Sequence, residues 1–342
     1  MWLDRWLLGM IEDPRDLRVV HVALAITFTV IPFAISLFVV PSFPWWLGGL
    51  YLALVIGVFL DRYTLMLHVT SHRRLFNAKY HSLRNFIPVI LGPFFGQPPW
   101  GYHAHHVGMH HVEGNLPADL SSTMRFRRDS FIDFMRYFGR FFFGIAIELP
   151  RYHFKRGKVG LGRRALFGEL GFDAFIIVGL LFNLQATLVV FVIPLFVIRF
   201  LMMAGNWGQH AFVDPADPAS PYRNTITCIN SPYNARCFND GYHISHHLKP
   251  TRHWSEHPQE LIENEAEYAK NEAFVLTGTD FFIVWLMLML KRHRWIASRL
   301  VPLGGVEKSV DERLAMIEAR LVPIVSSEET SPDRMREIRR TA

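Results

Sequence analysis

The stretch that decides the fold runs from Gly101 to Asn115 and reads GYHAHHVGMHHVEGN, with five histidines among nine consecutive positions. If this stretch is helical, His106 and His110, four residues apart, project from one face of the helix. His111 is rotated from them by about 100° and could reach a neighbouring ion. Clustered imidazole rings are typical of transition-metal sites, so the sequence predicts such a site here.

Histidine pairs with the same spacing recur at three other places in the chain. They are His68 with His72, Asn206 with His210 as a mixed pair, and His243 with His246 and His247. One such pair on a surface helix would carry little weight, but repetition at four places favours metal ligands. Magnesium and calcium are excluded because those ions prefer oxygen ligands, whereas imidazole suits zinc, copper, iron and nickel alike.

The apolar residues lie in long runs rather than being spread evenly. They make up 50% of the 342 residues, and basic segments separate the runs, which is the pattern of a polytopic membrane protein. The run from 166 to 203 would be about 57 Å long as one helix, nearly twice the hydrocarbon thickness, so we expect a turn near Asn183 to Ala186. The sequence therefore predicts an all-α fold with four transmembrane helices, at about 19–40, 45–67, 166–183 and 186–204.

Two further apolar segments are too short to cross a bilayer. They span eleven residues at 86–96 and ten residues at 281–290. Pro88 and Pro93 interrupt the first, which favours a re-entrant or interfacial piece. A span at 281–290 would also leave Lys291, Arg292 and Arg294 on the outer face, which argues against it.

The charges predict the orientation of the spans. Of the 36 Lys and Arg residues, none falls in either of the two short connections, between the first and second spans and between the third and fourth. By the positive-inside rule, both termini and the histidine-bearing segments are then cytoplasmic, in a bacterial inner membrane or the endoplasmic reticulum. We expect one integral-membrane domain over 1–325, with a helical cytosolic cap, and a flexible charged tail over 326–342.

Two other classes of protein are disfavoured by composition. The only cysteines, Cys228 and Cys237, are nine residues apart, which implies neither a disulfide framework nor a thiolate zinc site. The net charge of +6 could suit nucleic acid, but no basic stripe with interleaved aromatic residues is present. No nucleic-acid partner is therefore expected.

The predicted topology brings the histidines to one side of the membrane. One pair follows the second span, the central cluster lies in the long loop, and the others follow the fourth span. The predicted ligands are His68, His72, His106, His110, His111, His210, His243, His246 and His247. Nine ligands are too many for one ion and suit two, at four or five each.

These motifs resemble those of the membrane-bound fatty-acid desaturase and hydroxylase superfamily. That family is marked by three histidine boxes on a four-span scaffold with a cytosolic cap. The corresponding segments here are His68-Val-Thr-Ser-His72, His106-Val-Gly-Met-His110-His111 and His243-Ile-Ser-His246-His247. Asn206-Trp-Gly-Gln-His210 is similar to the Asn-x3-His element of acyl-CoA desaturases in this group. The resemblance covers roughly residues 19–260.

The resemblance implies a non-haem centre of two iron ions that uses O2 and two electrons per turnover. The implied substrate is a fatty acid or acyl-lipid, met among membrane lipids. The haem-binding signature of a fused cytochrome b5 domain is missing, because Gln259 and Glu260 follow His257-Pro258. Electrons must then come from a separate donor, such as ferredoxin or cytochrome b5. Desaturation is the favoured reaction; hydroxylation, and decarboxylation to a terminal alkene, remain alternatives that the residues do not separate.

Several residues near the boxes have open roles. The resemblance implies that Asn206 holds a metal-bound water. The extra histidines His103 and His105 could shift the ligand set of the second box, and His81 and His253 are expected to form hydrogen bonds. Candidates for orienting the ligand rings, or for ordinary loop roles, are His105, Glu113, Asn115, Asp119 and Asp240. Four cations could bind a substrate carboxylate, a phosphate or the electron donor, or remain solvated: Arg73, Arg74, Lys249 and Arg252.

Three other functions fit the histidine pattern less well. A metal transporter would place ligands near the bilayer midplane, whereas the predicted spans hold no histidine apart from His21 near a terminus. A zinc-dependent membrane receptor meets the same objection. A zinc hydrolase needs fewer histidines and one open coordination position.

Overall fold

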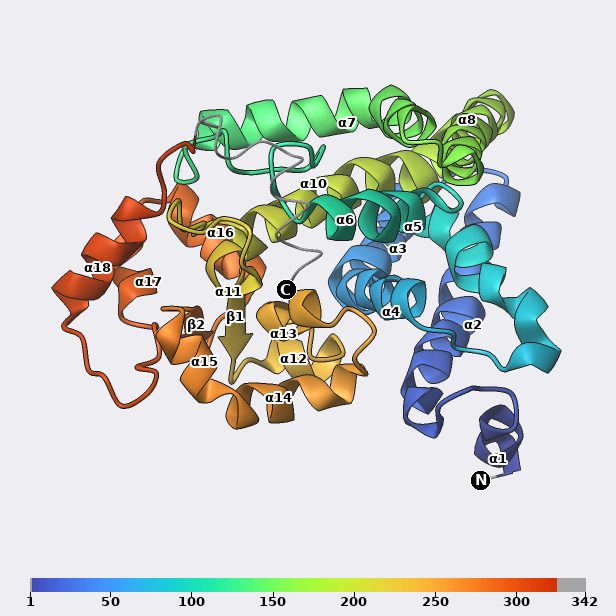
Figure 1. Cartoon of the computed structure of the whole chain (residues 1–342). Helices are drawn as coiled ribbons and strands as arrows, with labels where there is room; N and C mark the ends of the chain where they lie inside the picture. Colours follow the sequence, from blue (N-terminus) through green and yellow to red (C-terminus); the bar gives the residue numbers. More distant parts are fainter. Residues whose placement is uncertain (1, 325–342) are drawn as a thin grey trace. The chain divides into compact units, whose positions relative to one another are not determined.

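The computed structural model describes residues 2–324, and within this range the chain is mostly helical (Figure 1). It divides into two compact units. Unit 1 comprises Met1–Gly108 and Ala146–Phe200, and unit 2 comprises Met109–Ile145 and Leu201–Ala342. The predicted tail at 326–342 lies outside the described residues.

Unit 1 contains the long apolar helices together with several short helical turns. In chain order its elements are α1 (Trp2–Leu8), η1 (Pro14–Asp16), α2 (Leu17–Val39), α3 (Trp45–Leu52), η2 (Ala53–Phe59), α4 (Leu60–His72), η3 (Ala78–Asn85), η4 (Phe86–Leu91), η5 (Gly92–Phe95), α5 (Gly101–His105), α8 (Val159–Phe182), α9 (Leu184–Thr187) and η7 (Leu188–Val192). Three helices pass from one unit into the other: η6 (His106–His110), α7 (Phe131–Lys155) and α10 (Ile193–Gln209).

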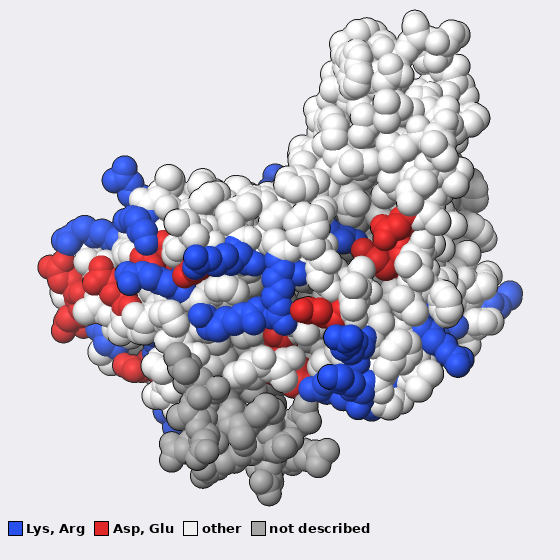
Figure 2. Space-filling view, turned by 90° about the horizontal axis from the view of Figure 1, so that it is seen from above, with Lys and Arg blue, Asp and Glu red and all other residues white. Residues whose placement is uncertain are grey.

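Four helical stretches are long and apolar enough to cross a membrane, which confirms the prediction of four spans. They are Pro14–Val39, Trp45–His72, Val159–Phe182 and Leu184–Gln209. Wide areas of the surface in Figure 2 carry no Lys, Arg, Asp or Glu, and exposed side chains of α2 and α8 include Phe28, Ile35, Leu181 and Phe182. Such exposure of large apolar side chains suits contact with lipid rather than with water.

The turn between the third and fourth of these stretches falls at Asn183, within the segment that the sequence predicts. α8 ends at Phe182, and Asn183 adopts an extended backbone, with φ −149° and ψ 96°. Its side-chain oxygen accepts a hydrogen bond from the Ala186 amide at 3.0 Å and so caps α9. One polar side chain therefore ends one helix and starts the next.

The two short apolar segments do not form candidate spans. The first becomes the π-helical turn η4 and the 3-10 turn η5, of six and four residues. The second becomes α16 (Phe281–Met289), which has nine residues. Both results agree with the length argument made from the sequence.

A close contact in unit 1 holds α8 against the segment that leads into the central histidine cluster. α8 packs on α5, and Gly168 lies where a Cβ atom would be 2.0 Å from the carbonyl oxygen of Pro99. No side chain fits at that distance, because the obstacle is backbone. Gly168 thus allows the Pro98 to Gly101 turn, and α5 after it, to lie directly on α8.

We expect Gly168→Ala to lower the free energy of unfolding by about 3 kcal/mol or more, because the Pro99 backbone must move to admit a methyl group. Gly171→Ala on the same helix is the matched control, since nothing lies within 4 Å of its Cβ position. The control should be neutral or slightly stabilising through helix propensity. Thermal unfolding of both variants in detergent measures the difference, and equal melting temperatures would refute the packing argument.

Unit 2 consists of short helices and the two strands found in the described part of the chain. Its elements are α6 (His111–Glu113), α11 (Pro221–Asn224), β1 (Ile226–Ile229), α12 (Pro232–Arg236), α13 (His243–Leu248), η8 (Trp254–Glu256), α14 (His257–Glu263), α15 (Glu265–Lys270), β2 (Phe274–Thr277), α16, α17 (His293–Ala297) and α18 (Val310–Ala319). The strands pair in parallel, with Ile226 opposite Phe274 and Ile229 opposite Thr277. This small sheet is a local exception to the all-α prediction.

The sheet stands beside α13, the helix that carries the last histidine box (Figure 1). Side chains from both strands, including Ile226, Phe274 and Leu276, join a buried apolar cluster with α16, α17 and α18. Burial of these side chains stabilises a region of short helices that could not persist alone. α13 is thereby attached to a packed core.

A buried arginine fastens the loop before α7 to the rest of unit 2. The Arg128 side chain is fully buried and donates to the carbonyl oxygens of Ala211, Arg320 and Val322, at distances between 2.6 and 3.2 Å. Burial lowers the pKa of Arg128 to about 10, and the adjacent Asp129 charge opposes the shift. Ala211 directly follows His210, so Arg128 also restrains a predicted metal ligand.

Candidate metal centre

Unit 1 brings three of the predicted ligands together. α4 supplies His68 and His72, and His106 begins the π-helical segment η6 after α5. The ring centroid of His68 lies 5.3 Å from that of His72 and 4.6 Å from that of His106. The His72 and His106 centroids are 4.9 Å apart. His106 of the second box therefore lies in one cluster with both histidines of the first box.

The central cluster is not a regular α-helix throughout, and its histidines divide between two groups. Residues His106–His110 form the π-helix η6, in which hydrogen bonds span five residues rather than four. His106 groups with His68 and His72 of unit 1, whereas His110 groups with His210, His243 and His247 of unit 2.

Unit 2 gathers four predicted ligands into a complete set. His110 ends η6, His210 follows α10, and α13 contributes His243 and His247. Each offers one ring nitrogen, and these nitrogens all lie within 4.8 Å of one another. The side chains of His110, His210 and His243 are buried, with at most 2% of their surface exposed. Residues separated by more than a hundred positions thus converge in one compact, water-poor place.

The spacing of the ring nitrogens suits ligands of one ion. The Nε2 atoms of His243 and His247 are 3.0 Å apart. Two nitrogens that bind one ion at about 2.1 Å and at right angles would be about 3.0 Å apart. The Nε2 atoms of His111 and His246, also in unit 2, are 2.9 Å apart and make a second pair of this kind.

His210 has a ring nitrogen that only a ligand outside the described protein atoms would satisfy. Its Nδ1 is 3.0 Å from both the backbone oxygen and the side-chain oxygen of Asn224, so Nδ1 carries the proton. The Nε2 lone pair is buried and has no hydrogen-bond partner among the described residues. Burial lowers the pKa of His210 to about 3, as does the nearby His110 ring, which favours the neutral, metal-binding form.

The carboxylate of Asp119 orients His110 in the same way. Asp119 is buried, and its Oδ2 atom accepts hydrogen bonds from His110 Nδ1 at 2.7 Å and from the Asn115 amide at 2.9 Å. Its Oδ1 atom accepts from the amide and the hydroxyl of Ser121, each at 2.7 Å. With Nδ1 committed to the carboxylate, Nε2 of His110 is the nitrogen left to bind an ion.

A pair of asparagines connects the supports of the two rings. The Asn115 side-chain nitrogen donates to Asn224 Oδ1 at 2.9 Å, while the Asn115 amide contacts Asp119. Asn224 in turn donates to the carbonyl oxygen of Gly114 at 3.1 Å. Sequence reasoning proposed Asp119 and Asn115 as orienting residues but missed Asn224. No spacing signal marks Asn224, because it lies fourteen residues after His210 in the one-turn helix α11.

Asn206 is held by two partners in unit 2. Its side-chain nitrogen donates to the carbonyl oxygen of Ser121 at 3.1 Å and to the hydroxyl oxygen of Tyr137 at 2.7 Å. These bonds direct the amide nitrogen away from solvent and fix the side-chain rotamer. Tyr137, a residue that the motifs did not point to, thus positions the predicted water-binding residue.

The remaining candidate residues lie outside the histidine sets. His105 is in α5, and Glu113 is buried at the end of α6. Asp240 accepts a hydrogen bond from the Tyr233 hydroxyl at 2.7 Å. Of the other histidines, His253 Nδ1 contacts the Ser255 hydroxyl, and His153, also missed from the sequence, bonds the Ala104 carbonyl oxygen at 3.0 Å. His153 thereby fastens α5 to the end of α7 within unit 1.

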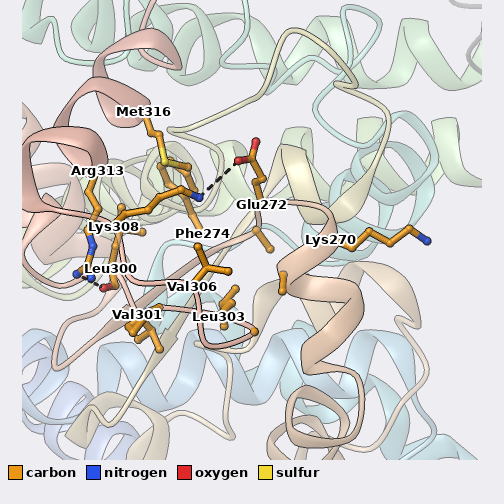
Figure 3. A pocket seen from close by; sticks show the side chains of 14 residues that line it. Lys270, Glu272, Phe274, Leu300, Val301, Leu303, Val306, Lys308, Arg313 and Met316 are labelled. Carbon is orange, nitrogen blue, oxygen red and sulfur yellow. Dashed lines mark hydrogen bonds and ion pairs between the residues drawn. The ribbon is translucent and has the colours of Figure 1, made fainter.

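A separate cavity of about 340 Å³ in unit 2 does not compete for the metal. It lies between β2 and the loop that follows α17, and Figure 3 shows Lys308 paired with Glu272 and Arg313 directed at the Leu300 carbonyl oxygen. None of the residues that line it is a histidine. The imidazole sets are therefore the better candidates, and an all-nitrogen donor set of neutral rings fits a transition metal.

One comparison with known proteins finds a match. Residues 44–278, more than half of the chain, match a family model described as "Fatty acid desaturase". No curated protein and no solved structure matches the chain. All nine predicted ligands and both asparagines, Asn115 and Asn224, fall inside the matched range.

Proposed function

Because the chain belongs to the fatty acid desaturase family, we propose that this membrane oxidoreductase is a fatty-acid desaturase that uses O2, two electrons and two iron ions. The observation that carries the proposal is the His110, His210, His243 and His247 set, whose ring nitrogens converge within 4.8 Å. The nine histidines are enough ligands for two ions. Bound iron would supply the activation of O2 needed to remove hydrogen from an unactivated C–H bond.

The protein's own groups prepare the site for this chemistry. Asp119 and Asn224 hold the Nδ1 protons of His110 and His210, so that both rings present Nε2 as the ligand. Burial keeps water from these rings and favours their neutral state. Neutral ligands leave the full positive charge on the metal, which keeps the centre electrophilic.

The reaction balances with an external reductant. Loss of two hydrogens from adjacent carbons supplies two electrons and two protons, the donor supplies two more electrons, two further protons come from water, and O2 becomes two molecules of water. A separate protein, ferredoxin or cytochrome b5 in type, is proposed as that donor. The distribution of Lys and Arg supports a cytoplasmic position for the termini and the histidines, where such donors occur.

The proposal predicts an internal alkene as the product. Purified, iron-loaded protein in lipid nanodiscs would be given O2, a chemical or protein reductant, and a panel of free and thioester fatty acids, with mass spectrometry of the products. Desaturation yields a product lighter by two hydrogens with the carbon number unchanged, and omission of the reductant or of O2 should abolish it. Hydroxy acids as products would show that the reaction is hydroxylation, and shortened terminal alkenes would show that it is decarboxylation. Absence of any O2-dependent product with every lipid tested would refute the proposal.

A further inference from the structure

A second cavity, of about 750 Å³, lies in unit 1 beside the first histidine box. Most of its wall comes from the end of α4 and the residues after it, through η3 to the start of η4. Trp100 before α5, His103 in α5 and Arg164 near the start of α8 complete the wall. This volume is in the range of small-molecule sites. The cavity is therefore large enough to hold part of a substrate.

The charge of this cavity is of one sign. Four arginines line it, Arg73, Arg74, Arg84 and Arg164, and no aspartate or glutamate does. Arg73 has an acidic partner, because its guanidinium donates to Asp13 Oδ2 at 2.9 Å, a carboxylate that also pairs with Arg15. Arg74, Arg84 and Arg164 form no ion pair or hydrogen bond with any side chain among residues 2–324. All three line the one cavity and are exposed to solvent.

Guanidinium groups in this arrangement favour an anion with several oxygens. Each presents a planar fork of N–H donors that matches a carboxylate or a phosphate. The three arginines come from separate elements, the segment after α4, η3 and the first turns of α8. Their convergence is therefore a product of the fold and not a run of basic residues in sequence.

The cavity also reaches a predicted metal ligand. His72 is one of its lining residues, and the His72 ring contacts His68 and His106 at the centroid distances given above. His103, another lining residue, lies near Arg164 and bonds the Ser71 backbone. An anion bound here would be tethered next to one of the histidine sets.

One wall of the cavity is held in an uncommon conformation. Trp100 has φ 60° and ψ −7°, in the left-handed region that bulky residues rarely adopt. Its indole N–H donates to Asn85 Oδ1 at 3.2 Å, and both residues line the cavity. The surrounding structure keeps this conformation, so a large ring held in a fixed position forms part of the cavity wall.

We infer that this cavity binds the anionic head group of the acyl substrate, a carboxylate or a phosphate-bearing thioester, through Arg74, Arg84 and Arg164. The inference rests on the proposed function for its identification of an acyl substrate. It adds to that function a choice of substrate: negatively charged acyl compounds bind, and neutral esters of the same chain length bind weakly.

The test compares Arg164→Gln and Arg84→Gln with matched controls. Arg163→Gln changes the neighbouring exposed arginine of α8, and Lys79→Gln changes an exposed cation of η3; neither lines the cavity. Steady-state kinetics would use hexadecanoic acid, its coenzyme A thioester and its methyl ester in nanodiscs of zwitterionic lipid. For the substrate that uses the site, we expect each single variant to raise KM about threefold to tenfold, with kcat changed less than twofold.

The double variant Arg84→Gln/Arg164→Gln should raise KM at least about tenfold, while the methyl ester and both control variants stay unchanged. A rise in KM for the free acid alone identifies a carboxylate site, and a rise in KM for the thioester alone identifies a phosphate site. Equal KM changes in Arg163→Gln and Arg164→Gln, or equal changes for acid and ester, would overturn the inference.

A binding measurement separates this inference from the proposed function. Equilibrium binding of hexadecanoic acid and of coenzyme A to the iron-loaded protein, without reductant, does not require turnover. If no substrate reacts but Arg164→Gln still weakens binding about threefold or more relative to Arg163→Gln, the proposed reaction fails and the anion site stands. If turnover occurs and binding of both probes is the same in all variants, the anion site fails and the reaction stands.

Discussion

Replacement of His247 by alanine is expected to reduce the iron content by at least half and turnover by more than about 100-fold. His247 sits among four other rings, with centroids 5.3 Å from His110, 4.7 Å from His111, 5.3 Å from His210 and 4.5 Å from His243. Desolvation lowers its pKa well below the usual value, and the neighbouring imidazoles add to the shift. Its removal takes one ligand from the four-histidine set of unit 2. Substitutions of residues that only orient a ligand already lower metal affinity or activity by about 10–100-fold, so loss of a ligand should lower them further.

The measurement is elemental analysis of purified protein by mass spectrometry, beside the product assay. His81→Ala serves as the control for iron content, because His81 belongs to none of the histidine sets found among the described residues. Elution volume and thermal unfolding confirm that each variant is folded. Equal iron loss in both variants would show that His247 is not a ligand.

Asp119→Asn is expected to weaken iron binding about 10–100-fold and to lower the free energy of unfolding by about 2–4 kcal/mol. The Asp119 carboxylate accepts four hydrogen bonds and donates none. An amide NH2 in its place would meet either His110 Nδ1–H with the Asn115 amide, or the two Ser121 donors. In either orientation the amide NH2 of asparagine, itself a donor, lies against two N–H or O–H donors and can accept neither hydrogen bond.

The two roles of Asp119 can be separated by experiment. Competition with an iron chelator measures affinity, and unfolding of the metal-free protein measures stability. Asp217→Asn is the matched control, since Asp217 is exposed in the loop after α10 and only its backbone oxygen is bonded. A fall in stability with unchanged iron affinity would mean that Asp119 only braces the loop and does not orient His110.

The sequence alone predicted the features that depend on local properties. Four helices follow from apolar runs of sufficient length, and the turn at Asn183 follows from a polar residue that can cap a helix within such a run. The two shorter apolar segments were excluded as spans by length, and they form short helices. The histidine spacing singled out the residues that the structure gathers into clusters in the two units.

Other features depended on contacts between distant residues. His106 and His110 belong to different clusters of rings, a grouping that their spacing of four residues does not reveal. Asn224 supports His210 from a single turn fourteen residues away, and Tyr137 holds Asn206 from α7. The pairing of β1 with β2 joins segments separated by 44 residues of other structure.

The amino-acid sequence by itself determined the membrane helices and the choice of imidazole as the donor, because helix length, hydropathy and ligand chemistry belong to individual residues and their near neighbours. Only the tertiary structure decided which rings lie close enough to share an ion, which nitrogen of each ring is available, and which arginines line one cavity in unit 1. Those properties depend on contacts between atoms of several helices and loops, and the spacing of residues along the sequence does not specify such contacts.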